Sequence, residues 1–347
     1  MSDSEDRPKL VVLVLSDGRP GHFNKSRAVI RALRSRYEVS ETWVDVTLRM
    51  SWARRLMAMV LNATARTVRC DWWLRWAYRI DAGGMTEQPD LIVSTGGNTM
   101  YANVILARKF GCPNLFVGAL RRLEPKHFWR VIHHRAYEPS PPHLQWPMTL
   151  VDIDRDELAA EATALRERLG LEDGTYWGLL LGGDGGGFHY TNEDMDDLAR
   201  CIERAHREDG VRWLITSSRR TSDEHERYLK SLLDSEWVAA TSWAGDEEPN
   251  DYRAYLGLAE RIACTEDSEM MIAEAIAAGK PVLSLRPRQG EASNQDALLR
   301  YESDGRIARQ TIVESGESGC RWPDSKSRGC DGDLAQLGEW LADALTS

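Results

Sequence analysis

The chain has 347 residues, of which 42% are hydrophobic and 28% charged, and its formal net charge is −10. This length favours two domains, and the acidic balance argues against a general nucleic-acid-binding protein. No apolar run reaches the roughly eighteen residues of a membrane span, and the acidic start of the chain lacks the pattern of a signal peptide. The six cysteines are scattered without a CxxC pair, which favours reduced thiols in a cytoplasmic protein.

The chain opens with a predicted strand followed by a loop that carries candidate catalytic groups. Residues 9–15 (KLVVLVL) form a near-continuous apolar run, typical of a parallel strand buried on both faces. A turn with two glycines and a proline follows, and Asn24 or Ser26 is expected to cap the next helix. Ligands of α/β domains bind past the carboxyl ends of the strands, so Asp17 and His22 are candidate catalytic residues. Taken singly, turn chemistry and an ordinary surface histidine would explain them as well.

Residues 51–80 stand out in an acidic chain because they combine four tryptophans with six arginines. Helices with tryptophan and leucine on one face and arginine on the other can lie at a membrane surface. An ordinary pair of packed helices with solvated arginines explains the segment equally well. The sequence therefore leaves open a peripheral position at the inner face of a membrane.

Another strand–helix unit and a further strand follow in the first half. A strand over residues 90–94 ends in TGGNT, a helix covers residues 100–110, and the next strand covers residues 114–118. This repeated order predicts parallel βα units, here a Rossmann-like acceptor domain over residues 1–150. Turn residues near the strand ends are the candidates for binding an acceptor: Gly18, Gly21, Asn24, Gly96 and Gly97.

The pattern restarts in a second domain, residues 151–330, after a charged helix. A buried strand over residues 176–181 is followed by residues 182–187, which include five glycines. Glycine allows a backbone to approach a phosphate closely, and the next helix, with an expected cap at Asn192, offers free N–H groups. We therefore predict a phosphate-binding loop; a flexible connection is the alternative.

The strand over residues 211–216 ends in SSRRT, a group of hydroxyl and guanidinium side chains. Such groups suit a diphosphate, because arginine binds phosphate bidentately and stays charged at any working pH. We favour this interpretation over a surface loop with solvated arginines, because the segment should lie beside the glycine loop.

Residues 265–295 are predicted to form a loop, an alanine-rich helix and a strand. Asp267 and Ser268 are good N-cap residues, and Gly279 is expected to end the helix in a left-handed conformation. Glu274 lies among small residues; it either accepts from a ribose hydroxyl pair or belongs to a solvated helix face. The candidates for binding a donor are therefore Gly183, Gly185, Gly186, Ser217, Ser218, Arg219, Arg220, Thr265, Glu266, Asp267, Ser268, Glu274, Asn294 and Gln295.

Three motifs, SDGRPGH, TSSRRT and TEDSEMMIAEAIAAGKPV, together resemble the elongated-mitochondria fission factor family of plants and its bacterial relatives. The bacterial members look like GT-B glycosyltransferases, and some are labelled nucleoside-diphosphate-sugar epimerases. The resemblance implies two Rossmann-like domains with parallel sheets facing a cleft, and a C-terminal helix, residues 331–347, packing back on the first domain. It also implies a nucleotide sugar in the second domain, with Glu274 at the ribose and Asn294 and Gln295 at the sugar. The chain departs from the family pattern in the segment GALRRLEPKHFWRVIHHRAYEPS. This departure concerns the identity of the acceptor and not the fold.

We therefore expect a glycosyltransferase that uses a nucleotide diphosphate sugar, with Asp17 or His22 as the base for an acceptor hydroxyl. No DxD pair lies in a metal-binding context, so neither a metal nor a cofactor is expected. The alternatives are an epimerase acting on the same donor and a non-enzymatic membrane adaptor. The transferase is preferred to the adaptor because Arg219, Glu274 and the glycines are all present.

Overall fold

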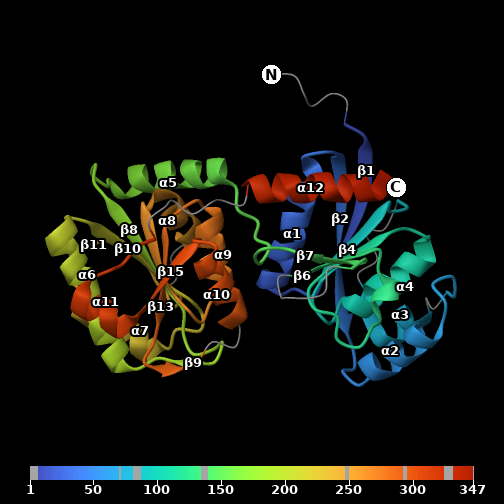
Figure 1. Ribbon diagram of the computed structural model, residues 1–347, viewed down its shortest axis with the longest axis horizontal. Helices are drawn as coiled ribbons and strands as arrows, with labels where there is room; N and C mark the ends of the chain where they lie inside the picture. Colours follow the sequence, from blue (N-terminus) through green and yellow to red (C-terminus); the bar gives the residue numbers. More distant parts are fainter. Residues whose placement is uncertain are drawn as a thin grey trace. The chain divides into compact units, whose positions relative to one another are not determined.

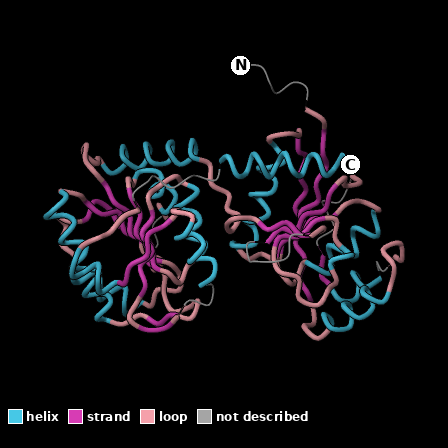
Figure 2. The backbone as a smooth tube through the Cα atoms, in the orientation of Figure 1, coloured by secondary structure: helices cyan, strands magenta, loops and turns pink. Residues whose placement is uncertain are grey.

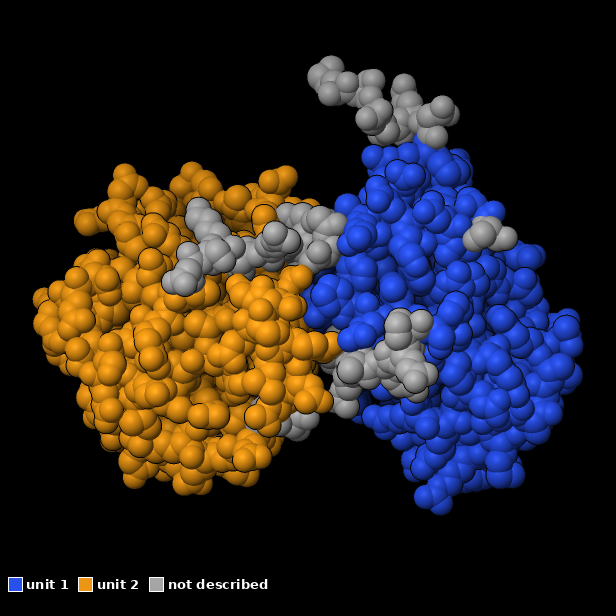
Figure 3. Space-filling model, in the orientation of Figure 1, with its two compact units in different colours: residues 1–152, 332–347 blue, residues 153–331 orange. Residues whose placement is uncertain are grey.

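The chain divides into two compact units: unit 1 is Met1–Asp152 with Gly332–Ser347, and unit 2 is Ile153–Asp331 (Figure 3). Asn294, a predicted contact to the donor sugar, lies outside the described residues. The computed structural model describes the following parts of the chain: 7–69, 72–80, 87–133, 140–246, 250–291, 295–323 and 331–346.

Unit 1 contains a seven-stranded sheet in the order β3-β2-β1-β4-β5-β6-β7, with helices on both faces (Figures 1 and 2). All its strand pairs are parallel except β2 with β3. The strands are β1 (Lys9–Ser16), β2 (Glu38–Leu48), β3 (Tyr78–Ile80), β4 (Leu91–Thr95), β5 (Asn114–Val117), β6 (Arg130–His133) and β7 (His143–Gln145). The helices of the first segment are α1 (Pro20–Arg34), α2 (Ala53–Ala63), α3 (Trp72–Ala77) and α4 (Met100–Phe110).

Strand β1 is buried on both faces, as its apolar run predicts. Leu13 and Leu15 belong to a hydrophobic cluster with residues of α2, α3 and α4. Val12 and Val14 point the other way, into a cluster with residues of α1. Alternate residues of a strand face opposite sides of its sheet, so one continuous apolar run supplies both cores.

Unit 2 contains an all-parallel, six-stranded sheet in the order β11-β10-β8-β12-β13-β15. Its strands are β8 (Tyr176–Leu181), β10 (Arg212–Ser217), β11 (Val238–Ser242), β12 (Arg261–Thr265), β13 (Val282–Arg286) and β15 (Ile307–Thr311). Two short segments, β9 (Phe188–His189) and β14 (Gln289–Gly290), form an antiparallel pair apart from this sheet. The helices are α5 (Arg155–Leu169), α6 (Asn192–Asp209), α7 (Asp223–Leu232), α8 (Tyr252–Leu258), α9 (Glu269–Ala277), α10 (Gln295–Ser303) and α11 (Ile312–Ser318).

Both sheets follow the same winding plan. In each, the strand that comes first in the chain has the second strand on one side and the fourth on the other. The direction of winding therefore reverses between β1 and β4 in unit 1, and between β8 and β12 in unit 2. In doubly wound folds, ligands bind past the carboxyl ends of the strands at this reversal, which points to one candidate position in each unit.

The expected cap of α1 is wrong. The helix begins at Pro20, with Arg19 at the N-cap, so Asn24 and Ser26 lie inside it. Proline suits the first helical position because its missing N–H would have no intrahelical partner there. Ser26 is buried, and its hydroxyl is hydrogen-bonded to that of Thr95 at 2.9 Å.

The expected cap of α6 is wrong by one residue. Thr191, not Asn192, occupies the N-cap, and it forms a capping box with Asp194. The Thr191 side chain accepts from the Asp194 N–H at 3.3 Å, and the Asp194 carboxylate accepts from the Thr191 N–H at 2.9 Å. Two otherwise free N–H groups are satisfied in this way, which one asparagine at the next position would not achieve.

The C-terminal helix, α12 (Asp331–Thr346), belongs to unit 1. Its Leu334, Leu337 and Leu341 join the same hydrophobic cluster as α1 and β1. Gly338 makes the approach to α1 close, because a Cβ at this position would lie 2.2 Å from the Ala32 carbonyl oxygen. No helix in the described part of the chain is long and apolar enough to cross a membrane.

Candidate functional site

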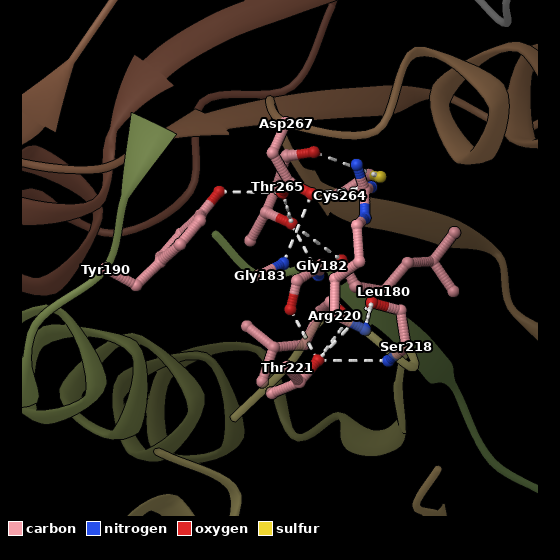
Figure 4. Close-up of polar contacts among 11 residues, drawn as sticks. Leu180, Gly182, Gly183, Tyr190, Ser218, Arg220, Thr221, Cys264, Thr265 and Asp267 are labelled. Carbon is pink, nitrogen blue, oxygen red and sulfur yellow. Dashed lines mark hydrogen bonds and ion pairs between the residues drawn. The ribbon is translucent and has the colours of Figure 1, made fainter. Parts of the chain in front are cut away.

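The side chain of Asp267 connects the loops at the strand reversal of unit 2 (Figure 4). Its Oδ1 accepts from the hydroxyls of Tyr190 and Thr265, each at 2.8 Å. Its Oδ2 accepts from the Gly183 N–H at 3.1 Å and lies 2.7 Å from Nη2 of Arg220. Four donors from separate segments converge on one buried carboxylate, so Asp267 fixes the positions of these segments.

Two glycines after β8 are required by close packing. A Cβ on Gly182 would lie 2.1 Å from Oδ1 of Asp267, and one on Gly183 would lie 1.9 Å from the Arg220 carbonyl oxygen. The Thr221 hydroxyl adds a donor to the Gly182 carbonyl oxygen at 2.5 Å. The glycine loop is therefore a packed element held by its neighbours, which argues against the alternative of a flexible connection.

Burial and hydrogen bonding oppose each other at Asp267. Burial has the largest influence and raises the pKa of this carboxyl, whereas the Thr265 hydroxyl, the Arg220 charge and the Gly183 N–H act to lower it. Burial, together with the charge of Asp267, also raises the pKa of Tyr190, so the phenol remains a donor. The cluster thus depends on all its donors being present.

Several predicted donor-site residues have internal structural roles. The Ser217 hydroxyl donates to Oε2 of Glu226 at 2.7 Å, and its oxygen accepts from the backbone N–H of Ala244. Glu266 is buried and accepts from two nitrogens of Arg309, Nε at 2.7 Å and Nη2 at 3.1 Å. These contacts fix the side chains of Ser217 and Glu266 at the carboxyl ends of β10 and β12.

Other predicted residues remain accessible. Arg219 is exposed and has no polar partner among the described residues. Arg220 carries its ion pair to Asp267, yet 43% of its side chain is exposed, so one side of the guanidinium faces solvent. Gly185 lies beside it, with a Cβ position 3.1 Å from Nη1 of Arg220. Gln295 is exposed at the first position of α10.

The expected N-cap position of α9 is confirmed for Ser268, but the expected side-chain hydrogen bond is not formed. The helix begins at Glu269 and Ser268 occupies the N-cap, but no side chain caps the helix there. The oxygens of Asp267 accept instead from Gly183, Tyr190 and Thr265. The helix ends as expected, with Gly279 in a left-handed conformation at φ +75°.

Glu274 has a partner that sequence reasoning missed. The Tyr252 hydroxyl, from the first residue of α8, donates to Oε2 of Glu274 at 2.5 Å. Burial, together with the Glu274 charge, raises the pKa of Tyr252 well above its ordinary value. Glu274 is half-buried, so it is not on a fully solvated helix face. A phenol and a carboxylate side by side can together bind a pair of hydroxyl groups.

A pocket of about 260 Å³ lies at the strand reversal of unit 1. Its lining includes Asp17 from the loop after β1, His22 from the first turn of α1, and Gly96 and Gly97 from the turn after β4. His22 thus belongs to the helix and not, as expected, to the loop. Nδ1 of His22 lies 2.9 Å from Oδ1 of Asp17. Gly96 has φ +95°, and a Cβ there would lie 2.3 Å from Nδ1 of His22, so only glycine leaves room for this histidine.

The structure gathers some of the predicted acceptor residues and not others. Gly18, Gly21 and Asn24 are not among the residues that line the pocket. Sequence reasoning missed the contributions of Arg54 and Arg121, which do line it. Arg54 lies in the basic, tryptophan-containing segment of residues 51–80, and no spacing signal relates it to the loop after β1.

That segment uses one face for packing and exposes large apolar side chains elsewhere. Leu61 and Trp73 are buried in the core of unit 1. Trp52, Met59 and Trp72 are 55%, 67% and 59% exposed. Each of the two interpretations of residues 51–80 thus finds a counterpart in the structure.

Residues 20–318 match the family model described as mitochondrial fission ELM1. The chain belongs to this family. The resemblance found in the three sequence motifs is therefore confirmed. No curated protein matches the chain. In the described part of this family member, no group of three or more His, Cys, Asp or Glu side chains is arranged to hold a metal ion.

Solved structures similar to this family member are two-domain enzymes. UDP-GlcNAc 2-epimerase from Neisseria meningitidis, bound to UDP-GlcNAc, aligns over 97% of this chain and 99% of its own, with 14% identity and a TM-score of 0.56. The Methanocaldococcus jannaschii UDP-GlcNAc 2-epimerase aligns over 96% and 99%, with 14% identity and a TM-score of 0.54. At these identities the likeness shows the fold, and it confirms the expected GT-B-like α/β architecture with two Rossmann-like domains.

Proposed function

We propose that this protein transfers a glycosyl group from a nucleotide diphosphate sugar to an acceptor hydroxyl. The observation that carries the proposal is the Asp267 cluster at the strand reversal of unit 2. It holds a glycine loop and an arginine-bearing loop together beside the start of α9. The similar Neisseria meningitidis structure holds UDP-GlcNAc, which supports a nucleotide sugar as the ligand.

The chemistry asks unit 2 to stabilise a leaving diphosphate, on which negative charge develops. Arg219 supplies an accessible permanent positive charge. The start of α9, which no side chain caps, supplies N–H groups and the positive end of the helix dipole. Glu274 with Tyr252 is proposed to bind the ribose hydroxyls.

The proposed base for the acceptor is His22, oriented by Asp17. When the imidazole is neutral and Nδ1 carries the proton, it donates to Oδ1 of Asp17 across the observed 2.9 Å. Nε2 then carries the lone pair and can accept the proton of an attacking hydroxyl. Asp17 would also stabilise the imidazolium that forms, as the carboxylate does in other Asp–His pairs.

Titration calorimetry with nucleoside diphosphates tests the donor site. We expect Arg219→Ala and Glu274→Ala each to weaken binding by about tenfold, because each removes a charged contact. Arg227→Ala, an exposed arginine on α7, is the matched control and should bind as the wild type does. Unchanged affinity in both site variants, with folding intact, would overturn the assignment.

Incubation with nucleotide sugars separates transfer from the alternatives. Release of an epimerised nucleotide sugar without an acceptor would replace the transferase by an epimerase. Failure to bind any nucleotide sugar would favour a non-enzymatic adaptor. For a transferase, Asp17→Asn and His22→Ala should lose turnover while donor affinity is kept.

A peripheral membrane contact through residues 51–80 is part of this proposal. Exposed Trp52, Met59 and Trp72 lie in a segment that also carries exposed Arg55 and Arg66. Tryptophan suits the interface of a bilayer, and arginine is attracted to anionic lipids. We expect co-sedimentation with anionic vesicles that weakens with added salt and after reversal of both arginines to glutamate. Absence of binding at low salt would refute the contact.

A further inference from the structure

The pocket of unit 1 has a strong excess of positive charge. Arg19, Lys25, Arg54 and Arg121 line it, and Asp17 is the one carboxylate among the lining residues. In a chain with net charge −10, this local reversal of sign is not explained by composition. A concave surface lined by like charges concentrates ions of the opposite sign.

Arg54 is held in place inside this pocket. Its Nη2 donates to Oδ1 of Asn98 at 2.8 Å, and the carbonyl oxygen of Asn98 accepts from the Tyr78 hydroxyl at 2.7 Å. The contact to Asn98 thus fixes the guanidinium in the pocket lining, where its permanent positive charge attracts an anion.

Asp17 does not neutralise the cluster. Its side chain is only 4% exposed, and Oδ1 is paired with His22. Its other oxygen lies 3.9 Å from Nε of Arg19. Arg121, by contrast, is exposed and lies over the turn after β4, with its guanidinium carbon 3.7 Å from the Cβ position of Gly97. One carboxylate, which is already paired with His22 and Arg19, therefore stands against four cationic side chains in the lining, and positive charge remains in excess.

We propose that this pocket binds a phosphate or diphosphate group. The inference rests on the proposed function in one respect only: in a glycosyltransferase, the molecule that bears this group is the acceptor. Arginine binds phosphate oxygens in a bidentate manner, and several fixed cations favour a multiply charged anion. The same chemistry would suit the headgroup of a phospholipid or a soluble phosphate ester.

Calorimetry with inorganic pyrophosphate on the full chain tests the pocket. We expect Arg121→Gln and Arg54→Gln each to weaken pyrophosphate binding by about tenfold or more. Arg121 has no polar partner among the described residues, so its variant should fold normally even if loss of the Asn98 contact disturbs Arg54→Gln. Arg36→Gln is the matched control, because Arg36 is exposed just after α1 in the same unit and does not line the pocket.

A second titration with UDP distinguishes this inference from the donor-site proposal. Loss of pyrophosphate binding with unchanged UDP binding supports the pocket, whatever the Arg219 and Glu274 variants show. If pyrophosphate binding is unchanged in both pocket variants, or is lost equally in Arg36→Gln, the inference about the pocket is overturned and the donor-site proposal is unaffected.

Vesicle binding identifies the source of the phosphate. If a lipid headgroup is bound, Arg121→Gln should reduce binding to phosphatidic acid vesicles more than to phosphatidylserine vesicles of equal charge. If the variant binds both vesicles as the wild type does while losing pyrophosphate, the ligand is a soluble phosphate ester.

Discussion

Replacing Gly183 by alanine should damage unit 2 through backbone contacts alone. The new Cβ would lie 1.9 Å from the carbonyl oxygen of Arg220 and 2.5 Å from the backbone nitrogen of Thr221. Neither neighbour is the end of a flexible side chain, so a loop has to move. Any such shift also strains the hydrogen bond from the Gly183 N–H to Asp267.

The size of the effect follows from these two contributions. Forcing an extra methyl group into a packed site costs about 1–3 kcal/mol, and an immobile obstacle places this case at the upper end. Losing a hydrogen bond to a charged acceptor adds about 1.5 kcal/mol. We therefore expect the free energy of unfolding to fall by about 4 kcal/mol, within the roughly 5–15 kcal/mol that domains have.

Guanidinium unfolding, monitored by the hydrogen exchange of residues 176–181 and 261–265, measures the stability of unit 2 separately from that of unit 1. Gly174→Ala is the control, because nothing lies within 4 Å of the Cβ position at Gly174. The control should stay within about 0.5 kcal/mol of the wild type. If the free energy of unfolding of Gly183→Ala lies within about 1 kcal/mol of that of the control, the loop adapts freely and the argument from close packing is wrong.

Three further outcomes are expected. Burial, with a contribution from nearby positive charge, depresses the pKa of His127 to about 4. As the pH falls below 6.5, the unfolded state therefore binds a proton that the folded state does not, and the stability of unit 1 should fall by up to roughly 3 kcal/mol between pH 6.5 and pH 4. Urea unfolding of the wild type and of His127→Gln across this pH range checks the expectation. Glu266→Ala should cost unit 2 about 3 kcal/mol because it removes the buried carboxylate from Arg309, whose side chain is 13% exposed, and leaves it, among the described residues, only the more distant Glu302. The double Glu266→Ala, Arg309→Ala variant should recover part of this in the same assay. Gly96→Ala should displace His22 and lower turnover, with donor affinity measured by calorimetry unchanged; normal turnover would remove His22 from the chemistry.

The fold was predictable because its strands carry strong local signals. The apolar run at residues 176–181 coincides with β8, and the run at residues 9–15 falls within β1. Glycines and prolines then mark where each strand ends. Helix starts were less predictable, because several capping residues compete: Thr191 displaced Asn192 through its reciprocal bond with Asp194.

The candidate sites were only partly predictable. Parallel strands end at the same edge of a sheet, and this predicted that the SSRRT segment lies beside the glycine loop. This rule does not say which side chains pair with each other, and so it missed the bonds of Asp267 to Tyr190 and Arg220. Tyr190, for example, is 77 residues away from Asp267 in the sequence. Only the three-dimensional packing turns such distant positions into neighbours.

The return of α12 to unit 1 has a consequence for the order in which the protein matures on the ribosome. Every strand of unit 2 is synthesised before Leu334, Leu337 and Leu341, which complete one core of unit 1. Domains fold as they emerge, so unit 2 can become native while the unit begun first still exposes α1 and one face of β1. A nascent chain stalled ahead of residue 331 would therefore offer its earliest segment, not its latest, to chaperones and proteases.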